Sequence, residues 1–342
     1  MIISLKNETN EKDLKKILDQ LTSLHIRHLV TKNKENAVIG TEKSLEAELL
    51  KEIKKLSSVS QVSEPKVPYQ LASLEHKKEK SVVWVKDVPI GGEEVVLMAG
   101  PCAIESLEQL VEIGRLLKQC GVKILRASAY KPRSSPYSFQ GLGEEGLKMH
   151  KEAQKNHGLL IETEVMDPRD VQMTAEYVDI IRVGARNMQN FDLLKELGRC
   201  GKPVILKRGL SSTIEEWLLS AEYLLAYGNP NVILCERGIR TFETMTRGTL
   251  DLSSVPVAKR LTHLPIIIDP SHAAGRADII PDLSKAAVAV GADGLLIEVH
   301  PRPRESVCDA KQALSPQEFS KLSEDLQRIA AAVHRRIEGG KL

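Results

Sequence analysis

Apolar residues follow two different patterns along the chain, and the change falls near residue 81. Before it, helical and alternating apolar spacings form small amphipathic segments. After it, eight short runs of continuous apolar residues alternate with segments of helical periodicity. The runs lie at 95–101, 122–129, 159–165, 179–185, 203–209, 232–238, 265–272 and 294–301. Such runs are typical of strands buried on both faces, which indicates a parallel sheet.

Eight strand-then-helix units within about 260 residues match the count and size of a (β/α)₈ TIM barrel. An open doubly wound sheet is the alternative, but no G-x-G-x-x-G follows the first run. A hairpin precedes the first run, and we expect its turn at Ile90-Gly91-Gly92. The pattern therefore predicts an α/β barrel over residues 81–340.

The N-terminal residues predict a smaller unit. Strands are expected at 2–5, 25–31, 37–40 and 59–62, with a helix after the first, which Asn10 would cap, and another after the third. The order βαββαβ is that of a ferredoxin-like domain. We assign 1–70 to this domain and 71–80 to a polar linker. From these residues alone, the domain reads as a structural or dimerising addition.

Composition narrows the class of protein without indicating its chemistry. The 342 residues are 42% hydrophobic, and no apolar run approaches the roughly 20 residues of a membrane span. The N-terminus lacks the pattern of a signal peptide. A net charge of +2 with interspersed charges gives no basic stripe for nucleic acid. Five cysteines without a C-x-x-C pair favour a reducing compartment. We expect a cytoplasmic protein with neither membrane nor nucleic-acid partners.

Ionisable residues stand at or near the end of each apolar run. In a barrel these ends meet at one rim, where the active sites of this fold lie. Cations outnumber the nearby carboxylates; they are Arg126, Lys131, Arg133, Arg186, Lys207, Arg208 and Arg237. Such an excess favours phosphate or carboxylate ligands, and the backbone of Gly184-Ala185-Arg186 offers further donors. Any single member of the set has the simpler interpretation of a salt bridge.

A metal site is a separate hypothesis. Cys102, His272, Glu298 and Asp309 follow the first, seventh and eighth runs, and strands one and eight are neighbours in a closed barrel. A thiolate, an imidazole and carboxylates suit Zn²⁺, Fe²⁺, Mn²⁺ or Co²⁺ better than Ca²⁺ or Mg²⁺. The alternative is that Cys102 is a buried core thiol.

Seven segments carry a resemblance to a known family. They are AGPCAIES (99–106), YKPRSSPYSFQGLGEEGL (130–147), GARNMQNFDLL (184–194), KPVILKRGLSSTIEEWLLSAEY (202–223), ILCERGIRTFE (233–243), DPSHAAGR (269–276) and EVHPRP (298–303). Together they resemble 3-deoxy-D-arabino-heptulosonate 7-phosphate (DAHP) synthase, in the type I beta branch with a regulatory ferredoxin-like domain. The resemblance implies condensation of phosphoenolpyruvate with erythrose 4-phosphate, the first step of the shikimate pathway.

The resemblance also implies residue roles. The metal ligands are those named above, and phosphoenolpyruvate is held by Arg126, Lys131, Gly184, Ala185, Arg186, Lys207 and Arg237. Pro132, Arg133 and Ser134 contact the sugar phosphate. Lys131, Glu164 and Lys207 manage protons. A homotetramer and feedback by Tyr or Phe are the family expectation.

Some positions depart from the family pattern, and rival functions stay open. Ala127-Ser128 replaces a Gly-Gly pair, Ser134 replaces Thr, and Cys308 places a second thiol beside Asp309. The nearest rival is 3-deoxy-manno-octulosonate 8-phosphate synthase, which uses arabinose 5-phosphate; Pro132 and the N-terminal domain favour the four-carbon aldose. A Schiff-base aldolase acting through Lys207 and a barrel that has lost catalysis are further alternatives.

Overall fold

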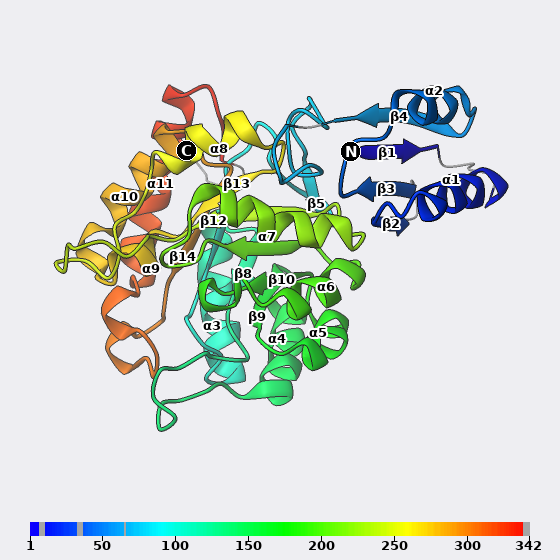
Figure 1. Cartoon of the computed structure of the whole chain (residues 1–342). Helices are drawn as coiled ribbons and strands as arrows, with labels where there is room; N and C mark the ends of the chain where they lie inside the picture. Colours follow the sequence, from blue (N-terminus) through cyan, green and yellow to red (C-terminus); the bar gives the residue numbers. More distant parts are fainter. Residues whose placement is uncertain (7–10, 33–36, 65, 338–342) are drawn as a thin grey trace.

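Eight parallel strands close into a barrel in the computed structural model, which describes residues 1–6, 11–32, 37–64 and 66–337 (Figure 1). The strands are β7 (Val96–Gly100), β8 (Ile124–Arg126), β9 (Leu160–Val165), β10 (Ile180–Val183), β11 (Val204–Lys207), β12 (Val232–Glu236), β13 (Ile266–Ile268) and β14 (Gly294–Glu298). Each of the eight apolar runs contains one of them. Strand β14 pairs with β7 and closes the ring, so the predicted (β/α)₈ barrel is confirmed.

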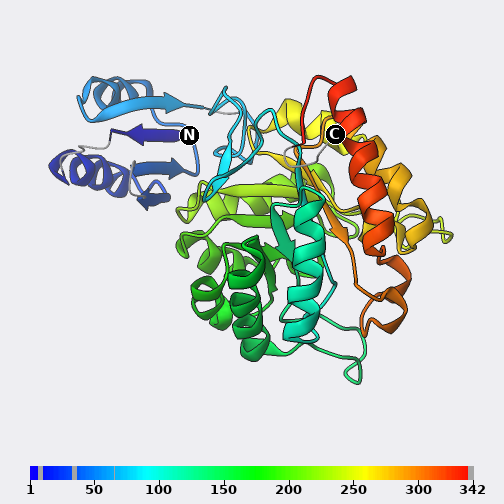
Figure 2. The same cartoon turned by 180° about the vertical axis from the view of Figure 1, so that it is seen from behind.

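Helices surround the barrel. They are α3 (Leu107–Gln119), α4 (Gly143–His157), α5 (Val171–Tyr177), α6 (Phe191–Arg199), α7 (Ile214–Ala226), α8 (Ser254–Leu261), the short α9 (Pro270–Ala274), α10 (Ile280–Ala289) and α11 (Pro316–Ala332). Single 3₁₀ turns lie at Pro168–Asp170, Ala185–Asn187, Ala277–Ile279, Pro303–Glu305 and Ala310–Gln312. Seen from behind, α11 lies beside α3, so the last helix packs on the first of the barrel (Figure 2).

Local sequence explains where the best-defined helices begin. Helix α7 starts with a capping box in which Thr213 and Glu216 satisfy each other's backbone N–H groups. One turn later, the fully buried Trp217 donates its indole N–H to the carbonyl of Leu206 at 3.0 Å. This bond ties α7 directly to β11.

The barrel interior has an apolar base and a charged top, because alternate residues of a strand face the same side. Along β8, Ile124 lies in the lower apolar cluster and Arg126 comes two residues later; β9 repeats this with Leu160 and Glu162. The hairpin of β5 (Val83–Val85) and β6 (Val88–Ile90) adds four side chains to the same cluster. The predicted hairpin exists, but its predicted turn was wrong.

The hairpin turns at Lys86-Asp87, where Lys86 has a positive φ of 53°. The predicted turn at Ile90-Gly91-Gly92 relied on its glycines. Gly91 has a different role, because a Cβ there would contact the Ser81 carbonyl at 2.6 Å. Glycine is therefore needed at that position for a close approach after the hairpin rather than for its turn.

The N-terminal unit has the predicted βαββαβ order. Its elements are β1 (Ile2–Leu5), α1 (Glu11–Ser23), β2 (His28–Lys32), β3 (Ala37–Thr41), α2 (Ala47–Lys55) and β4 (Val59–Ser63). The sheet order is β2-β3-β1-β4 with antiparallel pairs, and Leu14, Ile17 and Leu21 of α1 pack on it. Asn10, predicted as the cap of α1, lies outside the described residues. Strand β2 begins three residues later than predicted, because His25, at a φ of 52°, ends the helix in a turn.

The predicted linker, 71–80, lies against the barrel. The backbone N–H groups of Leu71 and Ala72 donate to Glu222 of α7 at 2.8 and 2.9 Å. Tyr69 and Ala72 are buried in the barrel's main core cluster. The N-terminal unit also reaches α7, because the hydroxyl of Thr31 donates to the Ala226 carbonyl. Among the described residues, no helix has both the length and the apolar character to cross a membrane.

Candidate active site

A cavity of about 380 Å³ opens at the carboxyl ends of the barrel strands. Its lining includes twelve of the fifteen predicted site residues: Lys131, Pro132, Arg133, Ser134, Glu164, Gly184, Ala185, Arg186, Lys207, Arg237, His272 and Asp309. These residues come from the ends of seven different strands, β8 to β14, and from the loops after them. The fold therefore brings together most of the residues that the sequence predicts at the rim.

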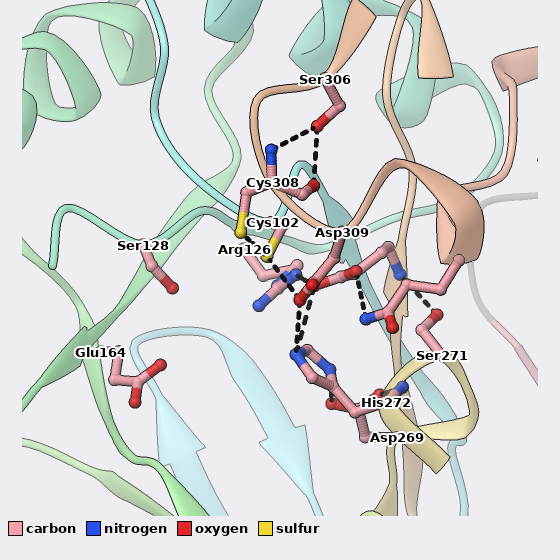
Figure 3. A network of polar contacts seen from close by, with 12 residues as sticks. Cys102, Arg126, Ser128, Glu164, Asp269, Ser271, His272, Ser306, Cys308 and Asp309 are labelled. Carbon is pink, nitrogen blue, oxygen red and sulfur yellow. Dashed lines mark hydrogen bonds and ion pairs between the residues drawn. The ribbon is translucent and has the colours of Figure 1, made fainter. Parts of the chain in front are cut away.

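The four predicted metal ligands form one cluster at the edge of this cavity. One ligand atom from each of Cys102, His272, Glu298 and Asp309 lies within 4.8 Å of the others. The Nε2 of His272 is 3.4 Å from Glu298 Oε1 and 4.0 Å from Asp309 Oδ2. Figure 3 shows Cys102, His272 and Asp309 directed at one another. Tetrahedral ligands with bonds of about 2.0–2.3 Å lie roughly 3.3–3.8 Å apart, so the cluster would hold a transition-metal ion once its widest separations close by about 1 Å.

The imidazole of His272 is held in the form that binds a metal. Its Nδ1 lies 2.7 Å from Asp269 Oδ2, and the other oxygen of Asp269 accepts the His272 backbone N–H at 2.9 Å. Burial lowers the pKa of His272 to about 4, against the opposing charge of Asp269. A neutral ring that donates from Nδ1 leaves the Nε2 lone pair facing the cluster.

The carboxylates of the cluster are held by groups outside it. Glu298 accepts from Arg126 Nη1 at 2.6 Å and from Gln312 Nε2 at 2.7 Å. Arg247 donates to Gln312 Oε1 at 3.0 Å and to Asp309 Oδ2 at 3.3 Å. Burial would raise the pKa of Glu298, but His272 and then Arg126 outweigh it and lower that pKa. The carboxylate is thus ionised and fixed in orientation.

Two thiols lie side by side at the cluster. Cys102 Sγ is 3.1 Å from Cys308 Sγ, and Lys131 Nζ donates to Cys102 Sγ at 3.0 Å. Arg133 Nη1 lies 2.7 Å from Cys308 Sγ. The hydrogen bond with Cys308, and then burial, raise the pKa of Cys102. A bound metal ion would favour its thiolate, because metals take cysteine deprotonated.

Two buried lysines differ in their environment. Lys207 forms an ion pair with Asp269, yet burial dominates and lowers the pKa of its ammonium. Burial acts in the same direction on Lys131, but Cys102, Cys308 and Glu164 outweigh it and raise that pKa. Lys207 is therefore the easier of the two to deprotonate.

Two cations of the predicted set do not line the cavity. Arg126 is fully buried, and its Nε and Nη2 have no hydrogen-bond partner within the described part of the chain. Arg208 is absent from the cavity lining and pairs with Glu236 at 2.9 Å and Asp251 at 2.8 Å. The simpler interpretation, a structural salt bridge, is the correct one for Arg208.

Some residues at the cavity and the cluster are not among the predicted site residues. Arg182, Arg240 and Arg247 line the cavity, and Asp269 and Gln312 support the cluster. The alternation along β10 was a usable signal for Arg182. It stands two residues after the inward-facing Ile180, in a run otherwise made of apolar residues and an initial Asp.

Comparison with known proteins identifies the family. The model of the DAHP synthetase I family matches residues 69–335. The phospho-2-dehydro-3-deoxyheptonate aldolase of Thermotoga maritima is 45% identical over 337 residues, covering 98% of this chain and all of that protein. The 2-dehydro-3-deoxyphosphooctonate aldolase of Syntrophotalea carbinolica is 31% identical over 273 residues, covering 74% of this chain and 98% of that protein.

Solved structures agree with these similarities. The crystal structure of the Thermotoga maritima DAHP synthase covers 98% of each chain at 44% identity, with a TM-score of 0.78. A truncated form of that synthase covers 78% of this chain and 98% of its own, at 46% identity and a TM-score of 0.74. The phosphooctonate aldolases are more distant than the heptonate aldolase. The chain belongs to the DAHP synthetase I family.

Proposed function

We propose that this enzyme uses a divalent metal ion, bound by Cys102, His272, Glu298 and Asp309, to condense phosphoenolpyruvate with erythrose 4-phosphate. The products are DAHP and inorganic phosphate. One observation carries the proposal: the four-residue cluster borders a cavity lined by Lys131, Arg133, Arg186, Lys207, Arg237 and further cations. The family and the full-length relative support the same reaction.

The cations suit the charges of the two substrates. These carry two phosphates and one carboxylate between them, and guanidinium groups bind both kinds of anion in a bidentate manner. We assign phosphoenolpyruvate to Lys131, Arg186, Lys207, Arg237 and the Gly184–Ala185 backbone, which line the cavity, and to Arg126, whose Nε and Nη2 have no hydrogen-bond partner among the described residues. Pro132, Arg133 and Ser134 form the sugar-phosphate end. Holding two anions in register supplies much of the rate through proximity.

The chain's residues then manage charge and protons. When bound, the metal ion supplies Lewis acidity toward the aldehyde of erythrose 4-phosphate. C3 of phosphoenolpyruvate forms the new bond to the aldehyde carbon, and Lys131 protonates the resulting alkoxide. Water adds at C2, and Glu164 accepts its proton. The C2 hydroxyl then passes its proton to the departing phosphate while C2=O forms and the C–O bond to phosphate breaks, and Arg186 and Arg237 hold the phosphate.

The choice of metal follows from the donor set. One thiolate, one imidazole and two carboxylates combine soft and hard ligands, which suits Zn²⁺, Fe²⁺, Mn²⁺ or Co²⁺. We propose that any of these ions restores activity to protein freed of metal. Ca²⁺ and Mg²⁺ are expected not to replace them, because they favour oxygen ligands alone.

We also propose that the N-terminal unit is regulatory and binds Tyr or Phe, and that the enzyme is a cytoplasmic homotetramer. The ferredoxin-like order and the contact of Thr31 with α7 support the regulatory role, whereas the tetramer and the location rest on the family resemblance alone. Helix α7 follows β11, which carries Lys207. A conformational change in the N-terminal unit would therefore reach the site through α7, which it contacts, and through β11, which precedes α7 in the chain.

Release of phosphate from phosphoenolpyruvate tests the function. We expect release with erythrose 4-phosphate at least about 100-fold faster, as kcat/KM, than with arabinose 5-phosphate. A chelator should abolish it. Preference for arabinose 5-phosphate would assign the chain to the octulosonate reaction instead. Chelator-resistant turnover with borohydride trapping of substrate on Lys207 would indicate a Schiff-base aldolase.

A further inference from the structure

Arg182 of β10 is a buried cation that the reaction proposed above does not use. Its side chain is 1% exposed, and each of its three guanidinium nitrogens donates to a different side chain. Nε donates to Glu162 Oε1 at 2.6 Å, and Nη2 donates to the hydroxyl of Ser128 at 2.7 Å. Nη1 donates to Glu164 Oε2 at 3.1 Å. The guanidinium is therefore fixed on three sides.

The same arrangement fixes Glu164 from two directions. Arg182 and Glu164 are direct partners in the register of β10 and β9, so their side chains leave the barrel wall next to each other. On the other side, Gly184 leaves room for Glu164 Oε1, because a Cβ at Gly184 would collide with that oxygen. One carboxylate oxygen is bound to Arg182, and the other lies against the cavity wall at Gly184.

We propose that Arg182 is a positioning residue that keeps Glu164 ionised and in one orientation as the acceptor of the water proton. The proposal rests on the role given to Glu164 under Proposed function. Ser128 and Glu162 complete the arrangement by fixing Arg182.

Among the charged groups around Glu164, Arg182 lowers the pKa of Glu164 the most. Burial would raise the pKa of Glu164, but Arg182, Lys131, Lys207 and His272 outweigh burial, in that order, and lower it. Lys131 comes from the loop after β8, Lys207 from β11 and His272 from α9. Lys131 donates to Cys102, and Lys207 pairs with Asp269.

Only Arg182 among these four forms a hydrogen bond to Glu164 in the described residues. Lys131 and Lys207 line the substrate cavity, so their charge is shared with ligands during turnover, and His272 is neutral and faces the metal cluster. The charge that Arg182 supplies is the same at every step. A carboxylate must be ionised to accept a proton, and a neighbouring cation lowers a carboxyl pKa by about 1–3 units.

The test is the pH dependence of kcat/KM in the full-length enzyme loaded with metal. Arg182→Gln removes the charge and keeps a side-chain amide that reaches toward Glu164. We expect the acid limb to move to higher pH by about one unit or more, because Glu164 then ionises later. We expect kcat at neutral pH to fall about tenfold. KM for phosphoenolpyruvate should stay within about threefold, because Arg182 is not assigned to substrate.

Two further variants keep the test decisive. Arg182→Gln leaves Glu162 as an unpaired buried carboxylate, which can impair folding. In Glu162→Gln/Arg182→Gln both buried charges are gone, and the acid limb should still move upward. Glu162→Gln alone is the matched control. Its acid limb should stay in place or move to lower pH, because Arg182 then has only Glu164 to neutralise.

The outcomes separate this inference from the proposed function. A folded Arg182 variant with the wild-type acid limb and kcat would overturn the inference. A large rise in KM for phosphoenolpyruvate with an unmoved limb would do so too, and would make Arg182 a substrate contact. Glu164→Gln decides the other question. If that variant turns over like the wild type, the role proposed for Glu164 fails; if it is inactive while the Arg182 variants keep the limb, only the present inference fails.

Discussion

At the scale of single residues, two uncharged residues, Gly184 and Gln312, set the positions of carboxylates at this site. Gly184 has a φ of −68°, which alanine also adopts, so its only special property is the missing Cβ beside Glu164. Gln312 is 2% exposed and joins Glu298 to Arg247. Each residue acts by setting the position of a carboxylate.

Gly184→Ala should lower kcat without unfolding the protein. The added methyl group displaces Glu164 Oε1, and a misplaced catalytic group loses about tenfold to 100-fold in rate. Steady-state kinetics and a thermal melt measure the two effects. Gly92→Ala is the control, because nothing lies within 4 Å of the Cβ it would add. Equal kinetics for both variants would contradict the placement of Glu164.

Gln312→Leu should weaken metal binding by about 10-fold to 100-fold, the usual effect of losing a support behind a metal ligand. The leucine cannot donate to Glu298 Oε2 or accept from Arg247. Competition with a chromophoric chelator measures the dissociation constant. Gln109→Leu is the matched control, since Gln109 is also buried but bonds His300 instead. The prediction fails if both variants bind metal like the wild type.

At the scale of elements, α7 connects the barrel to the segment before it. Glu222 of α7 accepts the backbone N–H groups of Leu71 and Ala72. Burial raises the pKa of Glu222 to about 7, although those N–H groups act in the opposite direction. The docking of this segment should therefore depend on pH near neutrality.

The proton that Glu222 binds determines whether folding stability rises or falls with pH. Between about 4.5 and 7 the native state holds the proton while the unfolded chain has released it, so this group's contribution to stability declines as pH rises through that interval. Glu222→Gln cannot ionise and should lose this decline. We expect the wild type to lose about 2 kcal/mol relative to the variant between pH 5 and pH 8. Urea unfolding at the two pH values measures it, and parallel changes in both proteins would refute the assignment.

The elements themselves were largely predictable, and the contacts between them were not. Each apolar run became a barrel strand because burial on both faces leaves little choice of residue. The ligand cluster was predictable because neighbouring strand ends converge. Arg182 was missed because a cation within an apolar run has no local partner in sequence; its partner Glu162 comes from β9 and Ser128 from the segment after β8. The hairpin turn was placed at glycines that serve a different contact.

At the scale of the whole molecule, the barrel core extends upstream of the predicted barrel boundary. Tyr69 and Ala72 belong to the main core cluster, and the family match begins at residue 69. A truncated form of the Thermotoga maritima synthase has a solved structure. The barrel of this chain should therefore fold without its first 65 residues.

Two truncations test this boundary. A chain of residues 66–342 should fold, retain phosphate release and lose any inhibition by Tyr or Phe. A chain of residues 76–342 should be less stable by about 3 kcal/mol or more, because it lacks Tyr69 and Ala72 and leaves Glu222 without its N–H donors. Thermal melts and the phosphate assay compare them. Equal melting temperatures would show that segment 66–75 contributes nothing to the barrel.

One measurement tests whether the reaction depends on a metal ion bound at the cluster. Metal-free enzyme is titrated with Co²⁺ while thiolate-to-cobalt absorption and DAHP formation from phosphoenolpyruvate and erythrose 4-phosphate are followed together. Both signals should rise in parallel and saturate at one ion per chain, and Cys102→Ser should abolish the absorption band. Full DAHP formation before any metal is added, or saturation of activity without a thiolate band, would contradict a reaction that depends on a metal ion bound by Cys102.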